Sequence, residues 1–325
     1  MKKILFLLLA GLLLCGCGGK GKVTPEYVLT YAENQPENYP TTMAARYFAQ
    51  LVEERSGGRI VIDVVSDARM GTQQEVVDQM IFGGIDFSRV SVSSVSDELP
   101  MLNVLQLPFL YENADHMWRI LDGQIGEDFL EVFEEAGLVG LSWYEGGSRS
   151  FYATTPIRSA EDLRGLTIRV QDSQMMKDMI TLLGAQPRTF AYSDVYAAFE
   201  TGKIDGAENS WASYESRFHD QVAPYYTEDK HTRVPEIQLA SGLIWQQLRE
   251  EDRQLIEACA RESAIYERSL WTKWEEAAMK RCIDRGAQVV NMEPQAYQQL
   301  RDMMEPLYEK YCGEYMDLID AIHNG

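Results

Sequence analysis

A short β-branched run, "GLTIRVQDS", places the permanent cation Arg169 directly before what looks like the start of a helix. In a strand of period two, Ile168 and Val170 point to one side and Arg169 to the other, so this arginine either lies in water or serves a partner. A guanidinium offers a planar fork that binds a carboxylate through two hydrogen bonds and keeps its charge at any pH. Arg169 is therefore a candidate anion-binding residue, with a solvated strand arginine as the alternative.

The sequence contains no motif for metal, nucleophilic or phosphate chemistry. The four histidines (His116, His219, His231 and His323) are scattered, with no HExxH and no pair at i, i+4. Neither a nucleophile elbow nor a GxxxxGK[ST] loop occurs. We therefore expect no metal and no cofactor.

The N-terminus predicts export. Lys2 and Lys3 precede the apolar run "ILFLLLAGLLL", which is too short and wrongly flanked for a stable spanning helix. The following "LCGC" resembles a bacterial lipobox, in which the last cysteine, Cys17, is lipid-modified and becomes the first mature residue. We expect a signal peptide over 1–17, a tether over 18–26 and a lipid-anchored protein in the periplasm or on the extracytoplasmic face of a bacterial membrane. An ordinary secreted protein cleaved nearby is the alternative.

Charge and cysteine content narrow the choice of partners. The net charge is −20, and loss of Lys2 and Lys3 with the leader takes it from −20 to −22. Such a chain repels nucleic acid and anionic lipid headgroups, and an anion site on it needs fixed local cations. Three cysteines remain beyond Cys17, which is too few for a complete disulfide framework.

Strand-like and helix-like segments alternate along the chain. We expect strands at 28–32, 59–66, 85–93, 138–145, 148–154, 166–170 and 237–245, and helices at 41–58, 72–84, 114–121, 125–135, 173–185 and 193–202. Thr72 and Glu75 have capping-box spacing at the start of one helix. Two long charged amphipathic stretches follow, at 249–286 and 294–322. This order indicates parallel α/β structure in two lobes that are joined by strands and braced by a long helix.

Several sequence blocks in this order resemble the solute-binding receptors of tripartite ATP-independent periplasmic (TRAP) transporters, the DctP-type family. They are "ARYFAQLVEERSGGRI", "MGTQQEVVDQMIFGGIDF", "LPFLY", "EGGSRSFYATTPIRSAEDLRGLTIRV" and "AYSDVYAAFETGKIDGAENSW". The resemblance covers essentially the whole mature chain and implies an α/β, two-lobed periplasmic-binding-protein-like fold with a ligand cleft between the lobes and a long bracing helix. It places lobe I at 27–145 and about 232–265, lobe II with the crossing helix at 146–231 and about 266–292, and C-terminal helices at 293–325.

The resemblance also implies a function. Such a receptor closes over an organic acid anion and delivers it to membrane permease subunits, and an ion gradient powers transport. In this family an arginine at the position of Arg169 pairs with the ligand carboxylate. Arg149 stands at a second position that contacts the acid, with a solvated loop arginine as the alternative. Asn209 stands where the family places an amide against the carboxylate, although it could equally cap a helix.

Other stretches, among them "GSRSFY" and "IRVQDSQMM", resemble the branch that takes up hexuronates such as glucuronate and galacturonate. A sugar acid needs one cation, many neutral hydrogen-bonding groups and an aromatic face against its C–H surface. The further candidates for these roles are Glu75, Ser91, Ser94, Tyr214, Glu236, Tyr192 and Trp211. Glu75 could instead only complete its cap, Trp211 could be core, and the two serines could be strand surface. Glu236, together with His231, either reaches the sugar or braces the lobe connection.

Other functions stay open beside the hexuronate receptor. The same receptor could take another sugar acid, a C4-dicarboxylate or sialate, although Ser91 stands where sialate receptors of the family carry an acidic residue. A receptor of an ATP-driven transporter or a chemoreceptor partner would share the fold. A lipid-anchored enzyme acting on acidic sugars would need paired carboxylates, which 50 acidic residues make easy to find on paper.

Overall fold

The computed structural model describes residues 24–325. The predicted signal peptide, Cys17 and most of the predicted tether lie outside the described residues. Within the described part, no helix combines the length and the apolar character needed to cross a membrane.

The first sheet has five strands in the order β2-β1-β3-β11-β4. Their bounds are β2 Ile60–Val65, β1 Tyr27–Ala32, β3 Phe87–Ser91, β11 Glu236–Ser241 and β4 Leu138–Tyr144. β1 lies parallel to both β2 and β3, whereas β11 is antiparallel to β3 and β4. The helices of this lobe are α1 Pro40–Arg55, α2 Gln73–Ile81, α3 Ala114–Leu121, α4 Gln124–Glu131 and α9 Gly242–Gln247.

The second sheet has seven strands, with the path β12-β9-β5-β8-β6-β7 and β10 paired to β5. Their bounds are β12 Gln288–Val290, β9 Tyr225–Thr227, β5 Ser148–Ala153, β8 Gly206–Asn209, β6 Thr167–Val170, β7 Gln186–Thr189 and β10 Thr232–Arg233. β6 lies parallel to β7 and β8. Around this sheet lie α5 Ala160–Leu163, α6 Gln174–Leu182, α7 Val195–Glu200 and α8 Trp211–Ser216.

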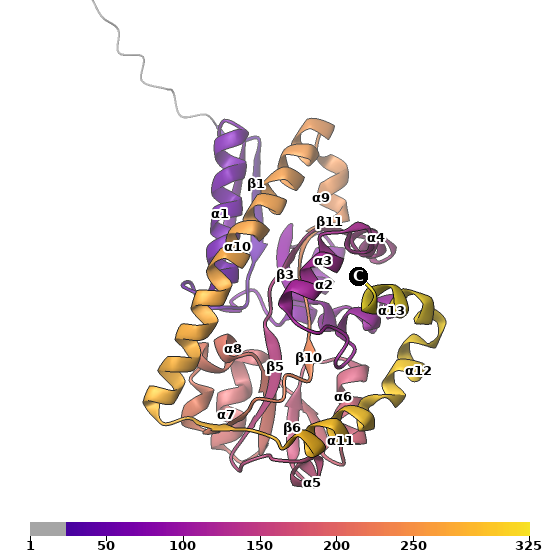
Figure 1. Ribbon diagram of the computed structural model, residues 1–325. Coiled ribbons are helices and arrows are strands. Elements are labelled where there is room, and N and C mark those ends of the chain that lie inside the picture. The colour runs from indigo at the N-terminus through magenta and orange to yellow at the C-terminus, as the bar shows by residue number, and fades with distance from the viewer. Residues whose placement is uncertain (1–23) are drawn as a thin grey trace, which may run out of the picture.

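The chain passes between the two sheets along two adjacent strand pairs and one helix. β4 leads into β5 through Gly146 and Gly147, and β10 leads back into β11. The 36-residue helix α10 Glu250–Arg285 runs the length of the molecule beside both sheets (Figure 1). The predicted two-lobed α/β fold with a long bracing helix is confirmed, while the predicted lobe boundaries stay a prediction.

The last stretch, expected as one amphipathic segment, divides into α11 Pro294–Met304, α12 Pro306–Cys312 and α13 Met316–His323. Pro306 has no backbone N–H to continue a helix, so α11 ends before it. These helices return along the side of the molecule away from α10 (Figure 1), and His116 Nε2 lies 2.7 Å from the carbonyl oxygen of Ile322. Lys310 of α12 also pairs with Asp178 of α6, so the C-terminal helices contact both lobes on this side.

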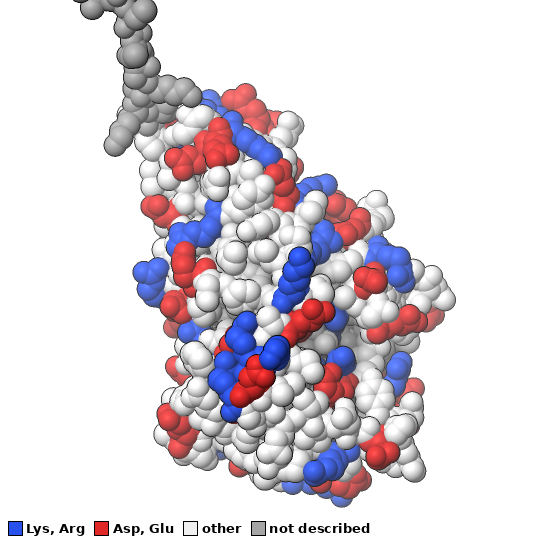
Figure 2. Space-filling view, turned by 60° about the vertical axis from the view of Figure 1, so that its left-hand side comes forward, with Lys and Arg blue, Asp and Glu red and all other residues white. Residues whose placement is uncertain are grey.

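The surface charge is mixed despite the net charge of −20. On the face shown in Figure 2, acidic and basic side chains alternate in small groups. The negative charge on this face is therefore not concentrated in one large acidic patch. A single cation can still attract an anion at short range, because salt screens the more distant charges.

Candidate functional site

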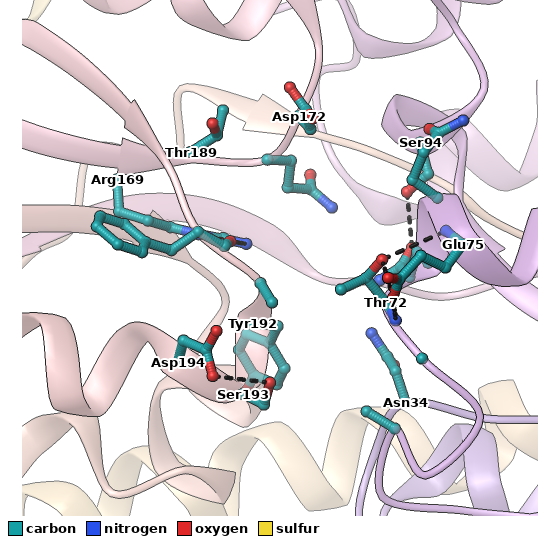
Figure 3. A pocket seen from close by; sticks show the side chains of 17 residues that line it. Asn34, Thr72, Glu75, Ser94, Arg169, Asp172, Thr189, Tyr192, Ser193 and Asp194 are labelled. Atoms are coloured by element: carbon teal, nitrogen blue, oxygen red, sulfur yellow. Dashed lines mark hydrogen bonds between the residues drawn. The ribbon is translucent and has the colours of Figure 1, made fainter.

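A cleft of about 450 Å³ separates the two sheets (Figure 3). One wall consists of residues that follow β1, β2 and β3, and it includes Asn34, Thr72, Glu75 and Ser94. The other wall consists of residues in or after β6 and β7, namely Arg169, Gln171, Asp172 and 189–194. Both walls therefore lie at the carboxyl ends of parallel strands, the usual place for a ligand in open α/β sheets.

Arg169 projects into this cleft from β6. Its neighbours Ile168 and Val170 are fully buried on the other face of the sheet, as the period of two predicts. Arg169 itself is only 5% exposed, so the alternative of a solvated strand arginine is wrong. Its Nε and Nη2 donate to the Phe190 carbonyl oxygen at 3.1 and 2.9 Å, which orients the guanidinium.

In the part of the chain that the structure describes, the charge of Arg169 has no counter-ion. Among the described residues, no carboxylate oxygen lies within 4.0 Å of its guanidinium nitrogens, although 19 arginine–carboxylate pairs occur elsewhere. Burial lowers the pKa of Arg169, the direction expected for a cation taken out of water without compensation. Most of its five N–H donors stay available to a partner in the cleft.

The other two buried arginines are paired, which sets Arg169 apart. Arg89 donates through Nη1 to Glu236 at 2.7 Å and also pairs with Glu33. Arg149 holds the carboxylate of Glu208, and its Nη1 donates to Asn209 Oδ1 at 3.0 Å. The carboxylates raise the pKa of both arginines, against the opposing effect of burial.

These pairings place Arg149, Asn209 and Glu236 in a buried ionic layer beside the cleft. None of the three lines the cleft, and their side chains already hold one another or Arg89. His231 adjoins this layer, since its Nε2 lies 3.8 Å from Glu208 Oε2, and its Nδ1 lies 2.5 Å from Asp229. These contacts of His231 lie within the second lobe, whereas Glu236 pairs with Arg89 within the first sheet, and a role in bracing the lobe connection stays a prediction for both.

Glu75 serves as a helix cap and also faces the cleft. Its carboxylate accepts from the Thr72 backbone N–H at 2.8 Å, while Thr72 Oγ1 accepts from the Glu75 N–H, so the predicted capping box is present. The hydrogen bonds from Thr72 lower the pKa of Glu75. The carboxylate is therefore ionised at neutral pH and can accept hydrogen bonds from a ligand.

Of the two predicted serines, one lines the cleft and the other is buried beside it. Ser94 lines the cleft, and its hydroxyl donates to Gln73 Oε1 at 2.9 Å. Ser91 is fully buried at the end of β3, and its backbone N–H donates to the same amide oxygen at 2.6 Å. Gln73 thus orients this corner of the wall, and Ser91 does not reach the cleft.

Of the three predicted aromatic residues, one lines the cleft and two do not. Tyr192 lines the cleft, where its hydroxyl donates to the Ser213 carbonyl oxygen at 2.6 Å. Trp211 stacks on Tyr226 at 3.6 Å between ring centroids, and Tyr214 is fully buried with its hydroxyl donating to Ala223. Both of these lie in the core of the second lobe, outside the cleft.

Several cleft residues escaped the sequence analysis. They are Asn34, Gln171, Asp172, Thr189 and Asp194, of which Thr189 is the last residue of β7 and the others follow the carboxyl end of a parallel strand. Ligands in open α/β sheets usually bind at the carboxyl ends of the strands, so this position could have marked these residues as candidates. Among the described residues, no group of three or more His, Cys, Asp or Glu side chains could hold a metal ion.

Comparison with known proteins agrees with this geometry. Residues 31–314 match the DctP family, which is described as bacterial extracellular solute-binding protein, family 7. A solute-binding protein of Chromohalobacter salexigens is 35% identical over 284 residues, which are 87% of this chain and 84% of that protein.

Two solved structures carry the comparison further. A TRAP periplasmic solute-binding protein from a Bradyrhizobium species, in complex with α/β-D-galacturonate, is 35% identical with a TM-score of 0.89. The match covers 91% of this chain and 99% of that one. A TRAP solute-binding protein from Pseudomonas putida F1 with bound D-glucuronate is 33% identical with a TM-score of 0.89, covering 91% of this chain and 96% of that one.

Proposed function

The chain belongs to bacterial extracellular solute-binding protein family 7, and from this premise we propose that it binds a hexuronate through Arg169. The protein is thus a solute receptor of a TRAP transporter. Its proposed ligand is galacturonate or glucuronate, because the similar solved receptors hold these two sugar acids.

The single observation that carries this proposal is the buried, unpaired guanidinium of Arg169 in the cleft. A buried charge is costly unless it is paired, so a partner of opposite charge must come from the ligand. The carboxylate of a sugar acid fits the fork of the guanidinium through two parallel hydrogen bonds.

The rest of the cleft suits a monoanion with many hydroxyls. Among residues 24–325, Arg169 is the only lysine or arginine that lines the cleft, whereas Glu75, Asp172 and Asp194 add three carboxylates. Lys177 pairs with Asp172 at 2.8 Å, which leaves Arg169 beside the carboxylates of Glu75 and Asp194, so a dicarboxylate fits less well than a monoanion. Sugar hydroxyls donate to such carboxylates, and the rings of Phe190 and Tyr192 offer apolar surface to the sugar.

The residues of the cleft suit ligand binding better than catalysis. A glycosidase or lyase needs a carboxylic acid whose pKa is held high enough to donate a proton. In the cleft, the cap lowers the pKa of Glu75, which removes it as such an acid. We therefore propose that the protein delivers its ligand unchanged to permease subunits, and that a lipid on Cys17 holds it at the membrane.

A thermal-shift panel of the purified protein tests this function. It compares galacturonate and glucuronate with C4-dicarboxylates, sialate and neutral hexoses. A ligand at 1,000 times its dissociation constant adds about 4 kcal/mol to stability, so uronates are expected to raise Tm while neutral hexoses do not. A shift with dicarboxylates or sialate alone would overturn the ligand but keep the receptor.

A further inference from the structure

A second cavity, of about 430 Å³, lies where α3, α10 and the connecting strands meet, and it shares no lining residue with the ligand cleft. Its walls carry three tryptophan–glutamate pairs, in each of which the indole N–H donates to a carboxylate oxygen. The pairs are Trp118–Glu145 at 3.0 Å, Trp211–Glu228 at 2.5 Å and Trp271–Glu275 at 3.2 Å.

Two of these pairs include a cation and one does not. Arg233 Nη1 lies 2.7 Å from Glu145, and Lys230 Nζ lies 3.1 Å from Glu228. For Glu275, no lysine, arginine or histidine nitrogen lies within 4.0 Å in the part of the chain that the structure describes. The cavity therefore holds two complete indole–carboxylate–cation triads and a third that lacks its cation.

The free carboxylate faces the connection between the lobes. Glu275 Oε1 lies so close to Gly147 that a β-carbon there would be 2.7 Å away. Burial and the neighbouring Glu145 raise the pKa of Glu275 to about 7, while Arg233, Trp271 and Lys230 act in the opposite direction. The carboxylate thus gains its charge near neutral pH, and the hydrogen bond it accepts within the described residues comes from the indole N–H of Trp271.

We propose that this cavity binds a small organic cation whose charged group pairs with Glu275 and completes the third triad. The volume is that of a typical small-molecule site, and Trp271 and Met279 provide apolar wall. Asp115 and Glu276, exposed lining residues, add negative charge. Arg268 cannot supply the missing cation, because it pairs with Asp122 and covers the ring of Trp118.

The chemistry favours an organic cation over a metal ion. Metal sites need several ligating side chains around one point, and the described residues hold no such group. A primary ammonium needs one carboxylate and tolerates an apolar or aromatic body beside it. Phenethylamine has this composition, and 2-phenylethanol is its neutral counterpart.

Calorimetric titration with phenethylamine tests the proposal. We expect saturable binding to the protein, at least about tenfold weaker binding of 2-phenylethanol, and a loss of about tenfold or more in Glu275→Gln. Glu257→Gln, on the same helix but outside the cavity, should bind phenethylamine as the unmodified protein does. Glu275→Asp, which keeps the charge, should bind more tightly than Glu275→Gln.

Two further readouts keep the result interpretable. A thermal shift of Glu275→Gln with galacturonate shows that the variant is folded and separates this site from the ligand cleft. Phenethylamine affinity should increase as pH rises through about 7, because the ammonium stays charged while Glu275 loses its proton. The proposal is overturned if phenethylamine shows no saturable binding at millimolar concentration, or if 2-phenylethanol or Glu275→Gln binds as tightly as the charged pair.

Discussion

Three arginines are buried in this protein, and what separates them is their partner. Arg89 and Arg149 pair with carboxylates of the protein itself, whereas the guanidinium of Arg169 donates to a backbone carbonyl oxygen and pairs with no carboxylate of the described residues. The paired arginines contribute to a structural layer, because removing one partner would leave an uncompensated buried charge. Arg169 is the residue on which the proposed ligand depends.

Glu75 can be a helix cap alone or a cap that also contacts the sugar, and one variant separates the two. Glu75→Gln keeps the capping geometry, since glutamine also serves at this position of a capping box. We expect a smaller loss of stability than in Thr72→Ala, because the cap keeps its hydrogen bond but loses the charge that Thr72 favours. We also expect about tenfold weaker galacturonate binding, because the charged acceptor for a sugar hydroxyl is lost. Thr72→Ala is the control, with a loss of about 1 kcal/mol in stability. Unchanged affinity in Glu75→Gln would leave the cap as its only role.

His231 makes stability depend on pH in the alkaline range. Although burial acts against it, Asp229 and Glu208 raise the pKa of His231 to about 9, above the 6.5 of an unfolded chain. Its stabilisation is therefore complete below pH 6.5 and is lost as pH rises to about 9, by roughly 3 kcal/mol in the free energy of unfolding. The other perturbed histidine, His219, does not titrate in this range, because burial lowers its pKa to about 3.

Urea unfolding between pH 6.5 and 9 measures this effect. His231→Gln should flatten the decline, and His323→Gln, at an exposed C-terminal position, should leave it unchanged. An equal slope in the His231 variant would assign the decline to other groups.

At the scale of elements, the sequence predicted the first sheet, and it predicted the second sheet and the site only in part. Alternating apolar residues and glycine stops located all five strands of the first sheet but only β5 and β6 of the second, and the segment expected as a strand at 237–245 divides into β11 and the helix α9. The spacing of Thr72 and Glu75 located a helix start that the structure confirms. Pairing between distant side chains has no such local signal. The partners of Arg149 and Arg89 lie 59 and 147 residues away, so the sequence could not separate a buried ion pair from a ligand contact.

The connection between β4 and β5 depends on Gly147. Its φ is +76°, and a β-carbon would lie 2.7 Å from Ser210 Cβ and 3.0 Å from the ring of Trp271. Gly165 has a similar φ of +79°, but a β-carbon added there would have no atom within 4 Å. A substitution at Gly165 therefore measures the backbone strain without the close contacts. We expect Gly147→Ala to lower the free energy of unfolding by roughly 2–4 kcal/mol and Gly165→Ala by about 1 kcal/mol. Equal losses in urea unfolding would show that the close contacts relax without cost.

At the scale of the whole molecule, two strand crossings and a long helix limit how the lobes can move. α10 is about 54 Å long at 1.5 Å per residue, so it can restrain both lobes at once. A ligand that contacts both walls of the cleft favours the conformation in which the walls are closer. Small-angle scattering should therefore show a smaller radius of gyration with galacturonate, and no change with neutral galactose. An unchanged radius with saturating galacturonate would contradict closure.

The most direct test of the account is calorimetric titration of galacturonate into the unmodified protein and Arg169→Ala, with Arg188→Ala as the control. Arg188 lies opposite Arg169 on β7 but is exposed. We predict a loss of about 2–5 kcal/mol in Arg169→Ala, none in Arg188→Ala, and a substantial loss in Arg169→Lys, because an ammonium cannot form the fork. Nearly unaltered affinity in Arg169→Ala would contradict the central claim that this arginine holds the ligand carboxylate.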